Sequence, residues 1–423
     1  MKLIKTREIK ESVIRIPGSK SISHRAMICA CLANGRSVIK NILKSDDLFY
    51  TIAGLEKMGA VIKETGNNII EVHGFNGSPE PYDGEIYLGN SGTSMRLLTG
   101  VTCLGNSTYV LSGDKRMCQR PMGGLISALN MAGATADSIH GNNSPPVRVN
   151  GEKAKGGRII LDCSKTSQYL SSVLIMGALL SDGLDIQLPS DPVSSPYIDL
   201  TIDIMEKFNV KAEKINGLNY RVSGNQQYEA KEFIVEPDLS NASYFWAAGA
   251  ITGKKIKVEN ISEKSLQGDL RLLEILEHMG CIIDYDTDGI SVTGKNDKGE
   301  NLNGVDVDMS DIPDVVPTLA VIASFANGKT IIRNIGHLRG KECDRIDAIV
   351  SQLFKMGVDV KQGKDFLSVI GGTPSGTFIE TFNDHRIAMA FSVAGLKVPG
   401  IKIENEECVG KSFPSFWELF DVL

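Results

Sequence analysis

The sequence predicts an α/β protein of two lobes, each built from three similar units of about 70 residues. Three observations predict this class. A run of small and apolar residues, a glycine turn and a β-branched run recur six times, a second helical pattern follows each of the first five turns, and the sixth repeat is incomplete. The turn glycines are 70 to 78 residues apart: Gly35, Gly105, Gly183, Gly253, Gly328 and Gly400.

Each repeat begins with an apolar run such as residues 26–33, which predicts a buried helix. The glycine turn leads into a strand, and an amphipathic helix follows that ends at a Gly or Asn in the left-handed conformation. These ends are Gly59, Gly133, Asn209, Gly280 and Gly357. A strand pair, such as residues 61–62 and 69–72, completes the unit. Such a small unit cannot cover its helices alone, so the units must pack together.

The sixth repeat is incomplete, because its second helix would lie beyond Leu423. Two alternating runs at the N-terminus, residues 3–5 and 12–16, can supply the missing strands. We therefore expect repeats one to three in a lobe of residues 18–237. Repeats four to six form a discontinuous lobe of residues 1–17 and 238–423, with a cleft between the lobes.

Composition excludes several classes of protein. The chain has 45 Lys and Arg against 51 Asp and Glu, a net charge of -6, which argues against a nucleic-acid partner. Its apolar runs are far shorter than the roughly 20 residues of a membrane-spanning helix, and the N-terminus lacks a signal-peptide core. Eight cysteines without a CxxC pair favour reduced thiols in the cytoplasm over a disulfide or zinc framework.

Polar residues gather where the six buried helices begin. They occupy residues 17–25, 88–96, 164–170, 236–243, 311–317 and 382–386. Ordinary N-capping explains any one of these segments, but helix N-termini also attract anions. We expect Lys20, Arg25, Arg96 and Arg386 in first helical turns, where a cation opposes the helix dipole unless an anionic ligand compensates.

Further cations are Arg120, Lys341, Arg345 and Lys411. If all eight form one cluster, the rest of the chain carries a net charge of -14, which suits small polyanions. The alternative for residues 339–345 is a solvated helix face on which Glu342 and Arg345 form an i,i+3 pair.

Nine motifs then follow the order of one enzyme family. They are PGSKSISHR, LGNSGTSMR, KRMCQRPM, TSQYL, SSPYID, IPD, KECDR, NDHR and GKSFP. Over nearly its whole length the sequence resembles the 5-enolpyruvylshikimate-3-phosphate (EPSP) synthases, which are enolpyruvyl transferases. The resemblance implies an inside-out α/β fold with three βαβαββ repeats per lobe. It also implies transfer of the enolpyruvyl group of phosphoenolpyruvate to the 5-hydroxyl of shikimate 3-phosphate, in aromatic amino-acid biosynthesis. We expect a monomer without cofactor or metal.

The resemblance assigns site residues by position. Shikimate 3-phosphate contacts are implied for Lys20, Ser21, Arg25, Thr166, Ser167, Gln168, Ser194, Tyr197, Asp314, His337 and Lys341. Phosphoenolpyruvate contacts are implied for Lys20, Asn90, Gly92, Arg120, Gln168, Arg345, Arg386 and Lys411. Catalytic roles are implied for Lys20, Asp314, Lys341, Glu342, His385 and Lys411.

These residue types fit an addition–elimination reaction. Arg offers bidentate contacts to phosphate and carboxylate, and Gly92 lets backbone N–H groups approach an anion closely. By hypothesis Asp314 takes the hydroxyl proton while an acid protonates the methylene carbon of phosphoenolpyruvate. Lys20, Lys341, Glu342 and Lys411 are all candidates for that acid.

Four positions depart from the usual family residues. Ser91 and Ser94 replace common alanines, Leu97 follows Arg96 where proline is frequent, and His337 stands where many members have Asn. The first three surround the position where glyphosate competes with phosphoenolpyruvate in the family, so sensitivity to that inhibitor is left open.

Two other functions compete with this interpretation. The sister transferase that acts on UDP-N-acetylglucosamine uses a loop cysteine, and Cys118 lies in the corresponding region. The surrounding KRMCQRPM and the Lys20-Ser21 pair favour an ordinary loop thiol instead. A non-catalytic anion-binding or RNA-end-processing protein could share the repeat, but pure binding would not need the carboxylates and histidine of IPD, KECDR and NDHR.

Overall fold

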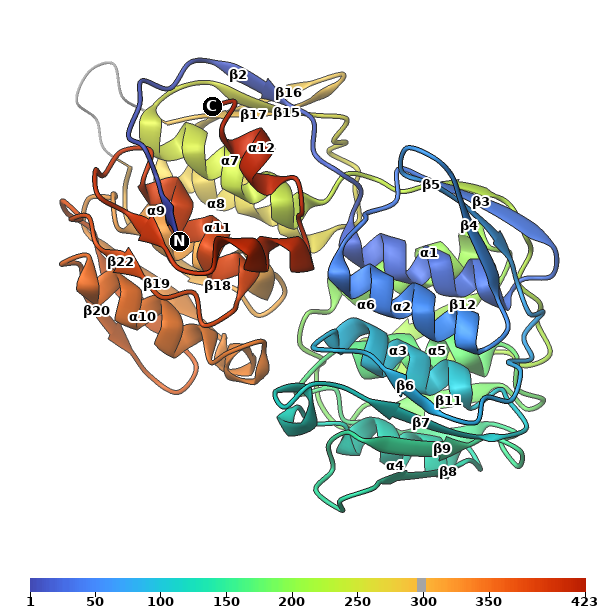
Figure 1. The fold of residues 1–423 in the computed structure, drawn as a ribbon. Helices are drawn as coiled ribbons and strands as arrows, with labels where there is room; N and C mark the ends of the chain where they lie inside the picture. Colours follow the sequence, from blue (N-terminus) through green and yellow to red (C-terminus); the bar gives the residue numbers. More distant parts are fainter. Residues whose placement is uncertain (295–301) are drawn as a thin grey trace. The chain divides into compact units, whose positions relative to one another are not determined.

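A computed structural model describes residues 1–294 and 302–423 (Figure 1). Contacts divide these residues into two compact units, Gly18–Val235 and Met1–Pro17 with Glu236–Leu423. Each unit has its own hydrophobic core. Within the described residues, no helix combines the length and the apolar character that a membrane crossing would require.

Three buried helices form the centre of unit Gly18–Val235. They are α1 (Lys20–Leu32), α3 (Gly92–Thr102) and α5 (Gln168–Gly177), which lie side by side in Figure 1. Small residues bring them close: a Cβ on Gly100 of α3 would lie 2.4 Å from the Ser172 hydroxyl of α5. Apart from polar residues, most of them near the N-terminal ends, these buried helices consist of small and apolar residues, which is the pattern that predicted them.

Each of these helices belongs to a repeat with a four-stranded sheet and an amphipathic helix. The sheet orders are β14-β3-β5-β4, β6-β7-β9-β8 and β10-β11-β13-β12. The strands are β3 (Arg36–Lys40), β4 (Val61–Gly66), β5 (Ile69–His73), β6 (Glu85–Tyr87), β7 (Thr108–Ser112), β8 (Thr135–Ser138), β9 (Val147–Asn150), β10 (Gly157–Ile160), β11 (Leu184–Gln187), β12 (Ala212–Asn216), β13 (Asn219–Val222) and β14 (Glu232–Ile234). The remaining helices are α2 (Asp46–Lys57), η1 (Met117–Gln119), α4 (Gly123–Met131) and α6 (Pro196–Lys207).

The second unit repeats this plan around α7 (Leu239–Thr252), α9 (Val316–Ala323) and α11 (His385–Ala394), which pack on one another. Its sheet orders are β16-β17-β15-β2, β18-β19-β21-β20 and β1-β23-β22. The strands are β1 (Lys2–Leu3), β2 (Ser12–Ile14), β15 (Ile256–Glu259), β16 (Ile282–Asp286), β17 (Gly289–Thr293), β18 (Asp306–Asp308), β19 (Lys329–Arg333), β20 (Asp359–Gln362), β21 (Leu367–Ile370), β22 (Phe378–Ile379) and β23 (Lys402–Ile403). The other helices are η2 (Gly268–Arg271), α8 (Leu272–Met279), η3 (Pro313–Val315), η4 (Gly336–Gly340), α10 (Arg345–Lys355), η5 (Glu406–Lys411) and α12 (Phe416–Phe420).

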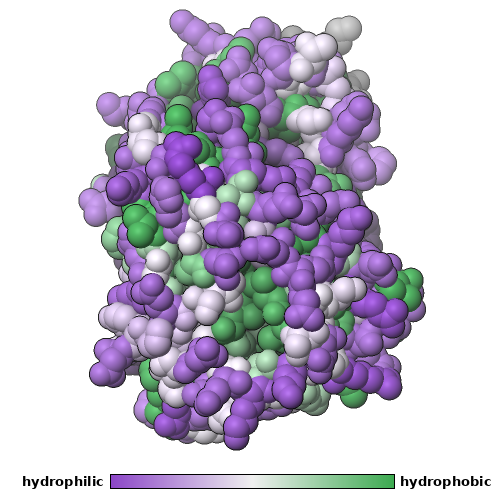
Figure 2. Space-filling model, turned by 90° about the vertical axis from the view of Figure 1, so that its right-hand side faces the viewer, coloured by the Kyte–Doolittle hydropathy of each residue, from purple (hydrophilic) through white to green (hydrophobic). Residues whose placement is uncertain are grey.

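The sheets cover the central helices and turn one face outward. Strands such as β3 and β11 therefore alternate between buried and exposed residues. Figure 2 shows one face of the molecule, on which hydrophilic side chains predominate and hydrophobic ones gather in smaller patches. The prediction of an α/β fold with three repeats in each of two parts is confirmed.

The left-handed helix ends are confirmed as well. Backbone φ is +100° at Gly59, +93° at Gly133, +64° at Asn209, +102° at Gly280 and +78° at Gly357. After each of these residues the chain leaves the helix and turns toward the next strand, as at Gly59 between α2 and β4. Glycine and asparagine tolerate this conformation best, so they specify where the helix stops.

The N-terminal strands do join repeats four and six, but the exchange goes further than the sequence suggested. Strand β1 pairs with β23, and β2 lies parallel to β15. In four sheets, the strand that precedes the central helix lies parallel to the strand that follows the same helix. In the other two, β2 precedes α1 yet lies beside β15, and β14 precedes α7 yet lies beside β3. The chain thus exchanges two equivalent strands where it passes between the units.

Candidate active site

Arg25 is the most deeply held cation of unit Gly18–Val235. Its Nε donates to the Thr201 hydroxyl at 2.7 Å, and its terminal nitrogens donate to the Ser171 hydroxyl at 3.0 Å and the Ser21 carbonyl at 2.9 Å. Burial lowers the pKa of Arg25 to about 10, which still leaves it protonated at neutral pH. Neutral oxygens therefore fix a buried positive charge in place.

Two further guanidinium groups converge on the start of α3. Arg96 donates to the Gln168 amide oxygen at 2.8 Å, and Arg120 donates to the backbone and side-chain oxygens of Asn90, each at 3.3 Å. A Cβ on Gly92 would lie 2.6 Å from a terminal nitrogen of Arg96 and equally close to one of Arg120. Only glycine fits there, because both guanidinium groups occupy the space of a side chain.

Four other predicted residues lie near these groups in the fold of the same unit. The Thr166 hydroxyl accepts from the Gln168 N–H at 3.2 Å, and Ser167 is buried just before α5. The Tyr197 ring lies 6.0 Å from the Arg25 guanidinium. Ser194 has φ of +57°, a conformation that costs free energy for a residue with a Cβ and that occurs preferentially at functional sites.

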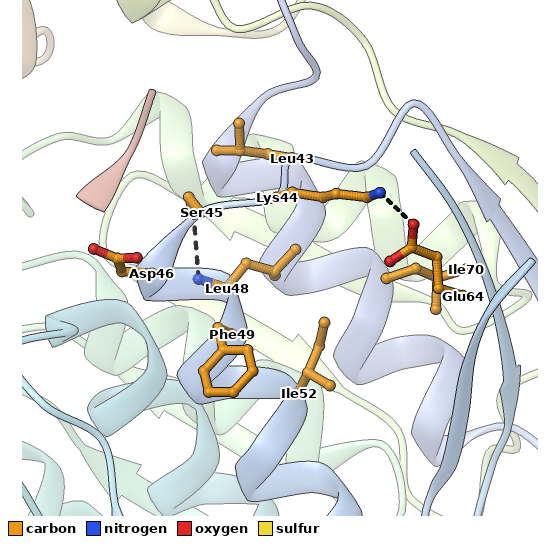
Figure 3. A pocket seen from close by; sticks show the side chains of 9 residues that line it. All are labelled: Leu43, Lys44, Ser45, Asp46, Leu48, Phe49, Ile52, Glu64 and Ile70. Carbon is orange, nitrogen blue, oxygen red and sulfur yellow. Dashed lines mark hydrogen bonds and ion pairs between the residues drawn. The ribbon is translucent and has the colours of Figure 1, made fainter. Parts of the chain in front are cut away.

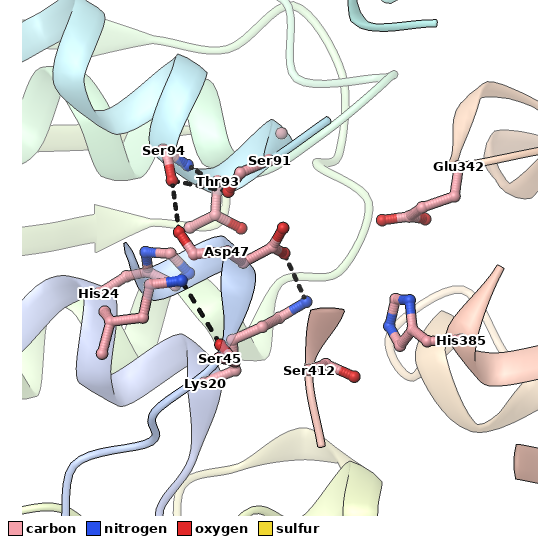
Figure 4. A network of polar contacts seen from close by, with 12 residues as sticks. Lys20, His24, Ser45, Asp47, Ser91, Thr93, Ser94, Glu342, His385 and Ser412 are labelled. Atoms are coloured by element: carbon pink, nitrogen blue, oxygen red, sulfur yellow. Dashed lines mark hydrogen bonds and ion pairs between the residues drawn. The ribbon is translucent and has the colours of Figure 1, made fainter. Parts of the chain in front are cut away.

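Lys20 begins α1 and forms an ion pair that was not predicted. Its Nζ lies 3.3 Å from a carboxylate oxygen of Asp47 at the start of α2, and both side chains are largely buried (Figure 4). Asp47 follows Asp46 directly in the sequence. That neighbouring pair gave no signal of which carboxylate faces inward.

In the second unit, Asp314 is the point on which three cations meet. Its carboxylate accepts from Arg345 at 3.0 Å and from Arg386 at 2.7 Å, and Lys341 Nζ lies 3.8 Å away. Asp314 lies on η3 just before α9, while Arg386 lies in the first turn of α11. Arg345 begins α10, so three helix starts meet at this carboxylate.

Arg345 joins Asp314 to two further carboxylates. It donates to Glu342 and Asp384, each at 2.7 Å, and its side chain is 1% exposed. Burial disfavours its charge, yet Asp384, Glu342 and Asp314 raise the pKa of Arg345 well above its ordinary value. The Glu342–Arg345 pair expected in the solvated-face alternative is present, but the solvated face itself is wrong because Arg345 is buried.

The remaining predicted residues of this unit differ in their surroundings. Burial and then the charge of Lys341 lower the pKa of His337 to about 3, so this ring is neutral at physiological pH. His385 is fully buried at the start of α11, with Nδ1 3.9 Å from an Asp384 oxygen. Lys411 ends η5, which packs against α11.

Two expectations about charge need correction. Arg25 and Arg96 lie in the second turns of α1 and α3, because those helices begin at Lys20 and Gly92; only Lys20 and Arg386 are in first turns. The eight cations are also not a bare positive cluster. Asp47 pairs with Lys20, and three carboxylates, those of Asp314, Glu342 and Asp384, lie among the cations of the second unit.

Sequence reasoning missed residues that hold the predicted ones. Thr201 and Ser171 fix Arg25, Asp47 pairs with Lys20, and Asp384 binds Arg345 while its side chain also caps α11. Asp384 lies inside the NDHR motif, so the motif itself could have indicated it. Thr201 lies in the middle of the amphipathic helix α6, and only the packing of α6 on α1 reveals its role.

Comparison with known proteins agrees with this geometry. Residues 4–420 match the sequence profile of the EPSP synthase (3-phosphoshikimate 1-carboxyvinyltransferase) family. Proteins named 3-phosphoshikimate 1-carboxyvinyltransferase from Nostoc punctiforme and Aliivibrio fischeri are 39% and 40% identical, over 97% and 96% of this chain and 96% and 95% of theirs. An EPSP synthase structure from Acinetobacter baumannii has a TM-score of 0.83 at 27% identity, covering 99% of this chain and 97% of that one. The chain belongs to the EPSP synthase family of transferases.

Proposed function

We propose that this enzyme transfers the enolpyruvyl group of phosphoenolpyruvate to the 5-hydroxyl of shikimate 3-phosphate and releases phosphate. In a chain of this family, the observation that carries the proposal is Asp314, a carboxylate held by Arg345 and Arg386. A base must accept the hydroxyl proton, and fixed guanidinium groups orient the oxygens of such a base. The product enters aromatic amino-acid biosynthesis.

The predicted contacts divide between the substrates by chemistry. We assign shikimate 3-phosphate to Arg25 with Ser21, Thr166, Ser167, Gln168, Ser194 and Tyr197, and also to Lys20, His337 and Lys341. We assign phosphoenolpyruvate to Asn90, Gly92, Arg120, Arg345, Arg386 and Lys411, with Lys20 and Gln168 touching both. Several fixed cations offset the repulsion between two substrates that both carry phosphate and carboxylate groups.

The proposed reaction has two stages. Asp314 accepts the 5-hydroxyl proton as that oxygen bonds to C2 of phosphoenolpyruvate, and a donor among Lys20, Lys341, Glu342 and Lys411 protonates C3. The tetrahedral intermediate then loses a proton from C3 and expels phosphate, which restores the C2–C3 double bond. We assign His385, which lies between Asp384 and Arg386 at the start of α11, to the enolpyruvyl group.

The decisive experiment follows phosphate release from phosphoenolpyruvate with each of two acceptors. Purified protein should release phosphate with shikimate 3-phosphate and not with UDP-N-acetylglucosamine. No release with shikimate 3-phosphate would overturn the proposal, and release with the nucleotide sugar instead would assign the chain to the sister reaction.

We also propose that the enzyme works as a cytoplasmic monomer that binds neither membranes nor nucleic acid. All eight cysteines are free thiols, which suits a reducing compartment. Light scattering of the purified protein at micromolar concentration should give the mass of one 45.8 kDa chain. A mass of two chains would contradict this part of the proposal.

A further inference from the structure

The Lys20–Asp47 pair stands out because it places a carboxylate beside a cation assigned to bind anions. The Lys20 and Asp47 side chains are 11% and 3% exposed, and their charged atoms are 3.3 Å apart. A fixed negative charge at such a place weakens the attraction of an anionic ligand. We therefore ask what the Asp47 carboxylate contributes that offsets this weaker attraction.

Asp47 is tied to the rest of the unit by a chain of buried side chains, of which Figure 4 shows the contacts of Ser94 with Ser91 and with Asp47. His24 Nδ1 lies 2.7 Å from the Thr51 hydroxyl, which lies 2.7 Å from the Ser94 hydroxyl. The Ser94 hydroxyl in turn contacts the Ser91 hydroxyl at 2.6 Å and the Asp47 carbonyl oxygen at 3.1 Å. We call His24, Thr51, Ser94 and Ser91 the hydroxyl relay.

Each hydroxyl group has one proton to donate, and this fixes the donor and the acceptor of each hydrogen bond in the relay. The Asp47 carbonyl can only accept, so the single hydroxyl proton of Ser94 points to it. Thr51 and Ser91 must then each donate to Ser94. Because the Thr51 proton is used in this way, its hydroxyl accepts from His24, which requires the Nδ1–H tautomer of the ring. Every hydroxyl proton of the relay is thereby assigned.

The relay connects three helix starts, and two of them, those of α1 and α3, bear proposed substrate contacts. His24 is one helical turn after Lys20 on α1, Thr51 is one turn after Asp47 on α2, and Ser91 caps α3 immediately before Gly92. A shift of Asp47 would therefore move both Lys20 and the start of α3.

We propose that Asp47 is a positioning residue, which orients the Lys20 ammonium and, through the hydroxyl relay, keeps it in register with Gly92. The inference rests on the proposed function, in which Lys20 and Gly92 contact phosphoenolpyruvate. The carboxylate lowers the net charge of the site but holds the ammonium in a single position. A misplacement of about 1 Å can cost a reaction roughly 100-fold in rate.

Asp46 provides a matched control. It is exposed and lines a separate cavity of about 320 Å³ with Leu43, Leu48 and Phe49 (Figure 3). The change Asp46→Asn removes the same charge from the same turn of α2. It leaves the contact between Lys20 and Asp47 in place.

The test measures kcat and KM for phosphoenolpyruvate with the whole enzyme. Asp47→Asn should lower kcat/KM for phosphoenolpyruvate by roughly 10- to 100-fold. Asp47→Glu should recover part of the loss, and Asp46→Asn should stay within about twofold of the wild type. Wild-type kcat/KM in Asp47→Asn, or an equal loss in Asp46→Asn, would overturn the proposal.

A double-mutant cycle separates positioning from folding stability. Thr51→Val replaces the relay hydroxyl by a methyl group of similar size, and we expect roughly a three- to tenfold loss in kcat/KM. Adding Thr51→Val to Asp47→Asn should cost little more than Asp47→Asn alone, because the relay acts through Asp47. Losses that multiply would overturn the proposal. A wild-type enzyme without phosphate release would instead refute the proposed function, independently of this cycle.

Discussion

The two units hold the guanidinium groups of their candidate sites in opposite ways. In unit Gly18–Val235, Arg25, Arg96 and Arg120 donate to hydroxyl, carbonyl and amide oxygens. In the second unit, Arg345 and Arg386 both donate to the Asp314 carboxylate, and Arg345 also donates to Asp384. Neutral partners orient a cation without cancelling its charge, whereas carboxylate partners nearly do.

This difference suggests a division of work between the units. A guanidinium group held by neutral oxygens keeps its charge for a ligand, which suits phosphate and carboxylate recognition. Several guanidinium groups fix the position and orientation of a carboxylate, which suits a base that must meet one particular hydroxyl group. The first arrangement favours binding, and the second favours chemistry.

Removing the central carboxylate should give the largest effect. Asp314→Asn keeps the shape of the side chain but not its basicity, so kcat should fall by roughly 10²–10⁴ while substrate binding changes little. Steady-state kinetics with both substrates measures this. The exposed carboxylate Asp365 of the same unit supplies the control Asp365→Asn, which should keep wild-type kcat. A kcat near that of the wild type in Asp314→Asn would remove the distinction between the units.

The carboxylates of the second unit also make the folding stability depend on pH, which can be measured. Asp269 is buried on η2, where it accepts a hydrogen bond from Ser240, and burial followed by the charge of Asp314 raises its pKa to about 7. The folded protein therefore holds a proton that the unfolded chain, with an ordinary carboxyl pKa of 3.8, releases at lower pH. Stability from this group is present below about pH 4 and is lost as the pH rises to about 7.

Asp269→Asn should remove that pH dependence, because an amide accepts from Ser240 without titrating. Three pKa units correspond to roughly 4 kcal/mol, so between pH 4 and 8 the wild type should lose about that much more unfolding free energy than the variant. Urea unfolding followed by the fluorescence of Trp246, which is buried on α7 of the same unit, reports it. If the unfolding free energies of the two proteins changed equally with pH, the raised pKa of Asp269 would be contradicted.

On the binding side, Gly92→Ala should act mainly on KM. Its Cβ would lie 2.6 Å from guanidinium nitrogens of Arg96 and Arg120, so both must move. We expect the KM for phosphoenolpyruvate to rise at least about tenfold, with a smaller change in kcat. Gly217→Ala, at a position with open space around it, should change neither constant. A fall in kcat at constant KM would place Gly92 with the chemistry instead.

Much of this fold could be predicted because it repeats. Glycine spacing indicated the six repeats, and the residues that end the amphipathic helices take the left-handed conformation they suggested. The partners of the cations could not be predicted. Thr201 and Asp47 reach Arg25 and Lys20 from other helices, and no sequence period specifies which side chains meet across a helix interface. Strand β14 was also missed, because it pairs with β3, a strand nearly two hundred residues earlier in the chain.

The smallest effect is expected at Cys118, and it tests the rival transferase. This half-buried thiol on η1 lies 3.6 Å from the Gly113 carbonyl, two residues before Arg120. If the Cys118 thiol takes no part in the reaction, Cys118→Ser should keep kcat and both KM values within about twofold of the wild type. A loss of more than tenfold would make Cys118 a participant in the reaction, as in the transferase that acts on UDP-N-acetylglucosamine. The binding unit would then contribute chemistry of its own, and the contrast between neutral and carboxylate partners would no longer separate binding from catalysis.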